Sequence, residues 1–366
     1  MREKAYKILT NVLSEILKTP PYLILFVSDK CWTKCNHCWF NEEWKSKYLK
    51  SKELSFDEID RISGSVNKLL FLSITGGEAF MRDDITEIVN LFTKKKKVVR
   101  YQIPTSGFDT DAIVMKVSKI LSQNKDIPFR VDVSLDGTEE THDKIRNRKG
   151  TFRNAVNTIK ELNKIKKKHS YFDVGVITTV AAENQFEIER ISDIVKEVHG
   201  NGEWMVNITR GKTRDENAGI IDYKNYYKTQ EIIDCRIKDG SYKGHSGHLT
   251  AKWISAKNFV RRDVIREILE GKYEGGGCSA GSIGGVVYGD GSVYPCEMLD
   301  RSFGNLRDFN FNFEKLWNSD RAVNIRNNIQ EAKCFCTQEC FLSTNFLIQP
   351  GLWYKTIAKK LKHSVN

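Results

Sequence analysis

Residues 22–38 read Tyr22-Leu-Ile-Leu-Phe-Val-Ser-Asp-Lys-Cys31-Trp-Thr-Lys-Cys35-Asn-His-Cys38, an apolar run followed at once by three closely spaced cysteines. The apolar run has the length and composition of a buried β-strand. Thiolates are ligands of iron–sulfur clusters. A C-x3-C-x2-C loop supplies only three of them, so a four-iron cluster held here would keep one iron open for chemistry. The same cysteines together with His37 would instead form a structural zinc site.

Alternating strands and helices follow this stretch. Further apolar runs of strand length occur at residues 69–75, 98–103, 129–135, 174–180 and 204–209. The amphipathic segments between them predict helices over residues 56–68, 84–97, 110–122, 152–168 and 187–199. Six strand-then-helix units predict parallel strands joined by right-handed crossovers. They are too few for a closed eight-stranded barrel.

Five more cysteines mark a different segment nearer the C-terminus. Cys278 and Cys296 bracket residues 284–295, which read as two short β runs around an Asp-Gly turn and predict a hairpin. A predicted helix over residues 313–329 separates this hairpin from a second group, Cys334, Cys336 and Cys340. Together these thiols can complete one metal site, which would be either iron–sulfur or a zinc ribbon.

Composition and the chain ends bear on compartment and partners. The nine cysteines come without a secretory signal, which predicts a reducing, cytoplasmic location. No apolar run has the roughly 18–20 residues of a membrane span. The net charge of +11 comes partly from lysines at predicted helix ends, which favours a solvated face over nucleic-acid binding. Residues 1–20 predict an amphipathic helix. The basic amphipathic tail at 346–366 either packs on its own domain or lies on an anionic membrane surface.

Polar motifs follow two other predicted strands, at the end where barrel enzymes carry their catalytic groups. Thr75-Gly76-Gly77-Glu78 follows the second strand, and its glycines allow the backbone to pass close to a ligand while its carboxylate can accept a bond from an ammonium group. Ser134-Leu-Asp136-Gly137 ends the fourth strand and precedes His142-Asp143 and Arg146. The Asp-Gly pair is equally consistent with a plain turn. Arg146 would either clamp a carboxylate through its fork or form a surface salt bridge.

These motifs, in this order, resemble the radical S-adenosylmethionine (radical SAM) enzymes of the SPASM/twitch group. The resemblance implies an α/β fold, with a partial (β/α)6 TIM-type barrel over residues 21–210 and a connector at 211–277. It also implies a small C-terminal β-hairpin/helix module for an auxiliary cluster at 278–345. In the family, a [4Fe–4S] cluster on three cysteines binds the amino and carboxylate groups of SAM. That role falls here to Cys31, Cys35 and Cys38.

The resemblance also suggests which other residues bind SAM. Gly76, Gly77 and Glu78 would hold its amino group, and Ser134 would contact its ribose or carboxylate. Two further candidate cofactor-binding residues are His37 and Arg146.

The resemblance to the family leaves the roles of three residues open. Asp136 points toward the substrate or orders its loop. Ser106, in Thr105-Ser106-Gly107, stands where relatives often have asparagine, so its function is left open. Cys235 is either a small buried residue or a hydrogen-atom donor of the kind that radical SAM epimerases use.

The C-terminal cysteines resemble an incomplete SPASM pattern. The full pattern has seven cysteines and two auxiliary clusters, whereas five occur here, as in the shorter twitch form. We therefore expect one auxiliary [4Fe–4S] cluster on Cys278, Cys296, Cys340 and one of Cys334 and Cys336. The implied cofactors are two [4Fe–4S] clusters and SAM, with a reducing partner such as flavodoxin or ferredoxin.

The resemblance implies reductive cleavage of SAM and abstraction of a substrate hydrogen atom. The cysteine loop begins at residue 31, which leaves no room upstream for a separate peptide-recognition domain. We therefore expect a radical SAM oxidoreductase or epimerase that oxidises or epimerises a sugar-like or carrier-bound small substrate. Modification of a peptide or protein is the alternative. A non-catalytic zinc scaffold or nucleic-acid adaptor is a third and more remote one.

Overall fold

The structure is a computed structural model that describes residues 18–95, 97–125, 127–240, 242, 251–346 and 348–363. The predicted helix over residues 1–20 lies outside this range except for residues 18–20, which are not helical.

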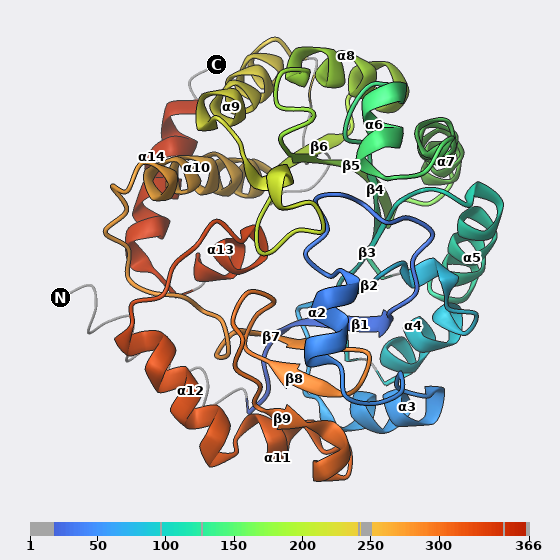
Figure 1. Ribbon diagram of the computed structural model, residues 1–366, viewed down its shortest axis with the longest axis vertical. Helices are drawn as coiled ribbons and strands as arrows, with labels where there is room; N and C mark the ends of the chain where they lie inside the picture. Colours follow the sequence, from blue (N-terminus) through green and yellow to red (C-terminus); the bar gives the residue numbers. More distant parts are fainter. Residues whose placement is uncertain are drawn as a thin grey trace.

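Six parallel strands form the centre of the molecule (Figure 1). They are β1 (Tyr22–Ser28), β2 (Phe71–Gly76), β3 (Tyr101–Thr105), β4 (Phe129–Ser134), β5 (Phe172–Val180) and β6 (Glu203–Ile208). The connecting helices lie outside them and include α3 (Phe56–Ser65), α4 (Ile85–Lys94), α5 (Thr110–Gln123), α7 (Thr151–Lys166) and α8 (Ile188–His199). The expected partial (β/α)6 barrel is thereby confirmed, because each apolar run forms a strand of one sheet and the amphipathic segments cover it.

The sheet continues past β1 into the C-terminal segment. Its order is β6-β5-β4-β3-β2-β1-β7-β8-β9, and β7 (Gly284–Val287) pairs parallel with β1, so that Tyr22 lies opposite Gly284. The predicted hairpin is formed by β7 and β8 (Ser292–Tyr294), and β9 (Gly304–Asn305) adds a short edge. The auxiliary segment is therefore built onto the barrel sheet instead of standing apart from it.

A glycine pair makes this junction possible. A Cβ on Gly285 would lie 2.5 Å from Cζ3 of Trp317, and one on Gly284 would lie 2.8 Å from Cε1 of Phe341. Trp317 and Phe341 are both almost completely buried. Two aromatic rings of the C-terminal segment thus fill the space that side chains on β7 would otherwise occupy.

Some predicted helices differ from the structure. The helix expected over residues 313–329 is two helices, α11 (Phe313–Trp317) and α12 (Asp320–Glu331). The break occurs because the Ser319 side chain caps α12 by accepting a bond from the Ala322 amide. The expected connector at 211–277 contains two helices, α9 (Tyr223–Lys238) and α10 (Ala251–Leu269).

The remaining helices are short or terminal. They are α2 (Glu42–Tyr48), α6 (Glu139–Ile145), α13 (Glu339–Asn345) and α14 (Pro350–His363). The helix α14 contacts α10 and buries Leu352 and Thr356, while Trp353, Tyr354 and Ile357 stay exposed. Part of the tail therefore packs on its own domain, and membrane contact by its exposed side stays a prediction. Within the described ranges, no helix is long and apolar enough to cross a membrane.

Candidate active site

The cysteine loop leaves the C-terminal end of β1 and is held by backbone bonds on two sides. The amide of Asn36 donates to the carbonyl of Ile145 at 2.8 Å, at the end of α6. On the other side, the Asp215 amide donates to the Asn36 carbonyl at 2.9 Å and the Arg214 amide to the Cys38 carbonyl at 3.1 Å. The loop is thus tied to both α6 and the segment after β6.

The three thiols of this loop differ in exposure. Cys31 is exposed, Cys35 is buried and Cys38 is half-buried. Thr33 Oγ1 lies 3.3 Å from Cys35 Sγ and 3.6 Å from Cys31 Sγ, so one hydroxyl links two of the sulfurs. Burial and the neighbouring Cys35 thiol raise the pKa of Cys38 to about 12. Coordination to a metal would deprotonate such a thiol.

His37 occupies the same loop as a half-buried, neutral imidazole. Burial lowers the pKa of its side chain to about 4, and its Nδ1 has no hydrogen-bond partner in the structure. In the parts of the chain that the structure describes, no group of three or more His, Cys, Asp or Glu side chains is placed so that it could hold a metal ion.

The Gly76-Gly77 turn lies directly against the start of the cysteine loop. The amide of Gly77 donates to the Ser28 carbonyl at 2.8 Å, and the amide of Glu78 donates to the Lys30 carbonyl at 2.7 Å. A Cβ would lie 2.2 Å from the Ser28 oxygen at Gly76, where φ is 143°, and 2.3 Å from the Lys30 oxygen at Gly77. Only glycine fits at either position, so these two residues bring Glu78 beside the cysteine loop.

The Glu78 carboxylate is buried and held by the loop after β3. Its Oε2 accepts bonds from Thr105 Oγ1 at 3.0 Å, the Ser106 amide at 2.9 Å and Ser106 Oγ at 2.8 Å. Burial raises the pKa of Glu78 above its usual value, and these donors oppose that shift. The structure thus places Ser106 as an anchor of Glu78, a contact that the sequence had not indicated. One oxygen, Oε1, accepts only a 3.3 Å bond from the Phe80 amide and keeps capacity for an ammonium donor.

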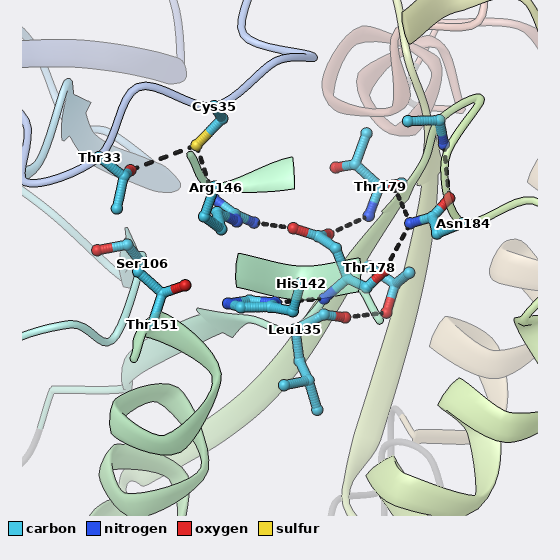
Figure 2. Close-up of polar contacts among 12 residues, drawn as sticks. Thr33, Cys35, Ser106, Leu135, His142, Arg146, Thr151, Thr178, Thr179 and Asn184 are labelled. Carbon is cyan, nitrogen blue, oxygen red and sulfur yellow. Dashed lines mark hydrogen bonds and ion pairs between the residues drawn. The ribbon is translucent and has the colours of Figure 1, made fainter. Parts of the chain in front are cut away.

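Asp136 is completely buried and forms an ion pair with Arg146 (Figure 2). Its Oδ1 accepts a 2.8 Å bond from the Thr179 amide. Arg146 Nη1 in turn donates to Cys35 Sγ at 3.4 Å. Burial favours protonation of Asp136, but the Arg146 guanidinium and nearby histidines hold the pKa of its carboxyl below the usual value. Of its two predicted roles, the ordering of a loop has direct contacts in this structure.

The other predicted site residues on the barrel are less engaged. Ser134 is half-buried at the end of β4, opposite Ile177 of β5. Cys235 is exposed on α9, in the outer layer of helices, and is not the small buried residue that was one expectation. No other predicted site residue lies on that helix.

The C-terminal cysteines gather at the second candidate centre. Burial is the main cause that raises the pKa of Cys278, and the thiols of Cys296, Cys334 and Cys336 add to it. These cysteines therefore lie in the same region, although among the described residues they are not arranged as a group that could hold a metal ion. Cys340 is hydrogen-bonded to the phenol of Tyr22 at the start of β1.

Charged residues surround this second centre, and sequence analysis missed them. Arg210, just after β6, forms an ion pair with Glu339 and donates to the Thr337 carbonyl at 3.4 Å. Gln338 donates to Glu297, and burial raises the pKa of Glu297 to about 7. Sequence analysis could have found these two acids only from their position beside a cysteine, because Glu297 follows Cys296 and Glu339 precedes Cys340 in the chain.

The two cysteine-bearing loops approach each other at Gly211. A Cβ on this residue, where φ is 71°, would lie 3.2 Å from Trp39 Cβ and 3.7 Å from Met298 Sδ. Trp39 follows Cys38, and Met298 lies two residues after Cys296. Trp39 and Met298, which flank the two cysteine groups in sequence, therefore both lie close to Gly211.

Comparison with known families decides between the alternatives. The profile of the radical SAM superfamily matches residues 25–202, and that of the SPASM iron–sulfur cluster-binding domain matches residues 278–341. The protein is a radical SAM enzyme with a SPASM domain. The cofactors expected from the motifs are confirmed with it: a SAM-binding [4Fe–4S] cluster, SAM and auxiliary iron–sulfur. The zinc-scaffold and adaptor alternatives are set aside.

Relatives of known name are similar over most of this chain. The antilisterial bacteriocin subtilosin biosynthesis protein AlbA of Bacillus subtilis is 25% identical over 82% of this chain and 60% of its own length. The cysteine-type anaerobic sulfatase-maturating enzyme of Clostridium novyi is 27% identical, over 84% of this chain and 82% of its own. The AdoMet-dependent heme synthase of Methanosarcina barkeri is 26% identical over 84% of both. This chain thus spans less than two thirds of AlbA.

A solved structure confirms the fold. The structure described as native anSMEcpe with bound AdoMet superposes with a TM-score of 0.59. It covers 94% of this chain and 100% of its own at 17% identity. At this identity the likeness supports the architecture alone.

The cysteine assignments give the first prediction. After anaerobic reconstitution, Cys35→Ala and Cys278→Ala should each lose about four iron atoms per chain, because each removes a predicted cluster ligand. Iron analysis of the purified variants measures this. Cys235→Ala is the matched control and should keep its iron; iron loss in the control, or none in the Cys35 variant, would contradict the assignment.

The Ser106 contact gives the second prediction. Ser106→Ala removes a hydrogen bond that fixes the Glu78 carboxylate, at a cost of about 1 kcal/mol, and should raise the Kd for SAM about fivefold. Ser106→Asn restores a side-chain donor and should bind SAM nearly as the parent protein does. Anaerobic calorimetric titration checks both, with Ser122→Ala on the exposed side of α5 as control. An unchanged Kd for Ser106→Ala would show that Glu78 needs no support from this loop.

Proposed function

We propose that this protein uses SAM to oxidise a residue of a peptide or protein substrate at a carbon–hydrogen bond. When bound, the reduced cluster and SAM supply a 5′-deoxyadenosyl radical that abstracts the hydrogen atom. The observation that carries the proposal is the approach of the two cysteine loops at Gly211, with Trp39 on one side and Met298 on the other. In this proposal the substrate carbon binds beside Gly211, between the two cysteine-bearing segments.

The chain's own residues divide the remaining work. Glu78, fixed by Ser106, offers a carboxylate oxygen to the amino group of SAM. Glu297 lies next to the auxiliary ligand Cys296 and is held by Gln338. Oxidation of a carbon radical releases one electron and one proton. A carboxylate beside the auxiliary cluster can accept the proton while the cluster accepts the electron.

The substrate class is supported by the relatives' names. A bacteriocin and a sulfatase are both polypeptides, and the two relatives named for their biosynthesis or maturation align with 82% and 84% of this chain. The expectation of a sugar-like or carrier-bound substrate depended on the length of chain before residue 31, which is a weaker argument. A non-peptide substrate remains the second candidate, because a relative named as a heme synthase aligns equally well.

The reaction type is supported by the position of Cys235. An epimerase needs a hydrogen-atom donor of the protein positioned beside the substrate radical. The proposed donor, Cys235, is exposed on the outer helix α9. Glu297, by contrast, follows Cys296 in the chain and lies near Arg210. This contrast favours oxidation over epimerisation.

A deuterium-transfer experiment tests the substrate class. Cells that naturally produce the protein are grown in deuterated medium. Their extract is then incubated anaerobically with the reconstituted protein, SAM and dithionite. Mass spectrometry should find deuterium in 5′-deoxyadenosine, and digestion of the extract with a protease, inactivated before the assay, should abolish it. Transfer that survives digestion would favour the non-peptide candidate, and no transfer from any extract would contradict hydrogen abstraction.

The proposed proton acceptor gives a separate prediction. Glu297→Gln keeps the shape of the side chain but removes its basic oxygen, and should lower product formation about 100-fold. Formation of 5′-deoxyadenosine and the iron content should stay near parent levels. Glu314→Gln, which changes a partly exposed acid on α11, is the control and should have no effect. Equal loss of product and of 5′-deoxyadenosine would instead assign Glu297 to SAM cleavage or to folding.

A further inference from the structure

We propose that Arg146 is a positioning residue that donates to the Cys35 ligand and makes the SAM-binding cluster easier to reduce. The inference requires that Cys35 is a cluster ligand, which the iron analysis described above tests separately. It assigns Arg146 to the cluster, whereas the sequence had suggested either a carboxylate clamp or a surface salt bridge.

The contact between Arg146 and Cys35 lies inside the protein. Arg146 follows the last residue of α6 and is only 7% exposed. Its Nη1 donates to Cys35 Sγ at 3.4 Å, while its Nη2 forms the ion pair with Asp136. Figure 2 shows the guanidinium lying between the sulfur and the rest of the polar network. The positive group is therefore nearer to the sulfur than its counter-ion is.

Asp136 is itself held firmly, which fixes the guanidinium. The Thr179 amide donates to Asp136 Oδ1 at 2.8 Å, and the Asp136 amide donates to His142 Nδ1 at 3.0 Å. Asn184 donates to the Asp136 carbonyl at 2.7 Å. Rotation of Arg146 toward the carboxylate of a bound cosubstrate would break its ion pair with this buried acid, at a substantial cost.

Two other arginines hold the same loop without touching a sulfur. Arg214 Nη1 donates to the Cys35 carbonyl, and Arg148 Nη1 donates to the Trp32 carbonyl, both at 2.6 Å. Arg148 is exposed, so water screens its charge. Among the hydrogen bonds of the described residues, Arg146 is the arginine whose side chain donates to a thiol of this loop.

The physical effect follows from charge. Reduction of a cluster adds one negative charge, part of which resides on its thiolate sulfurs. A charge-assisted donor to one sulfur stabilises the reduced form more than the oxidised form. Hydrogen bonds to cluster sulfurs and local charge are among the main determinants of cluster potential. Removal of Arg146 should therefore make the cluster harder to reduce.

The test compares Arg146→Gln with Arg148→Gln, which remove equal charge from neighbouring positions. Both are reconstituted anaerobically as the full chain and titrated with mediators without SAM, and the reduced SAM-binding cluster is followed by electron paramagnetic resonance. At a fixed potential, Arg146→Gln should lower the ratio of reduced to oxidised cluster about tenfold, which is about 59 mV for one electron. Arg148→Gln should change it less than twofold.

Different results would overturn the proposal. Equal shifts in the two variants would mean that only net charge matters, and an unchanged potential with weaker SAM binding would assign Arg146 as a cosubstrate clamp. If Arg146→Gln does not hold its cluster, Arg146→Lys keeps the charge but cannot bond both Asp136 and Cys35. For Arg146→Lys, the ratio of reduced to oxidised cluster should fall by less than tenfold, yet by more than it does for Arg148→Lys. Equal ratios in the two lysine variants would refute the inference.

Discussion

The pairing of β1 with β2 on one side and β7 on the other is the constraint on which the site depends. β1 leads into the cysteine loop, β2 into the Gly-Gly-Glu turn, and β7 carries the hairpin between Cys278 and Cys296. Parallel neighbours present their carboxyl ends at the same edge of a sheet. This rule places the cysteine loop beside the Gly-Gly-Glu turn. Cys278 and Cys296 instead flank the hairpin at the amino end of β7, near the start of β1, so backbone pairing ties both cysteine groups to the same strand.

Long-range polar contacts then complete the mouth of the barrel. Glu78 is anchored by the loop after β3, and Arg146 at the end of α6 reaches back to Cys35. Arg210 after β6 fixes the loop that carries Cys336 and Cys340. Each of these side chains comes from a different strand-to-helix unit. The site thus depends on the whole partial barrel, and each anchoring contact is at least partly buried, where solvent screens it less than at the surface.

Much of the fold and the ligand set could be predicted from the sequence, because strands such as Tyr22–Ser28 are contiguous apolar runs and cysteine spacing is local. The break at Ser319 was missed because it depends on a cap inside an otherwise helical pattern. The partners of Glu78 and Arg146 were missed for a different reason. Arg146 and Cys35 are 111 residues apart in sequence, and no local pattern specifies such a contact. The role of Glu297 depends on packing in the same way.

The glycine pair on β7 also limits how such proteins can be recombined. Because Gly284 and Gly285 accommodate Phe341 and Trp317 against a strand of the barrel, the C-terminal segment and the barrel share a single interior. A chimera that exchanged only the segment after Cys278 would pair a foreign strand with β1 and place foreign aromatic rings against it. A successful exchange would have to transfer β1, β7 and both rings together, so these parts are expected to vary as one unit among relatives.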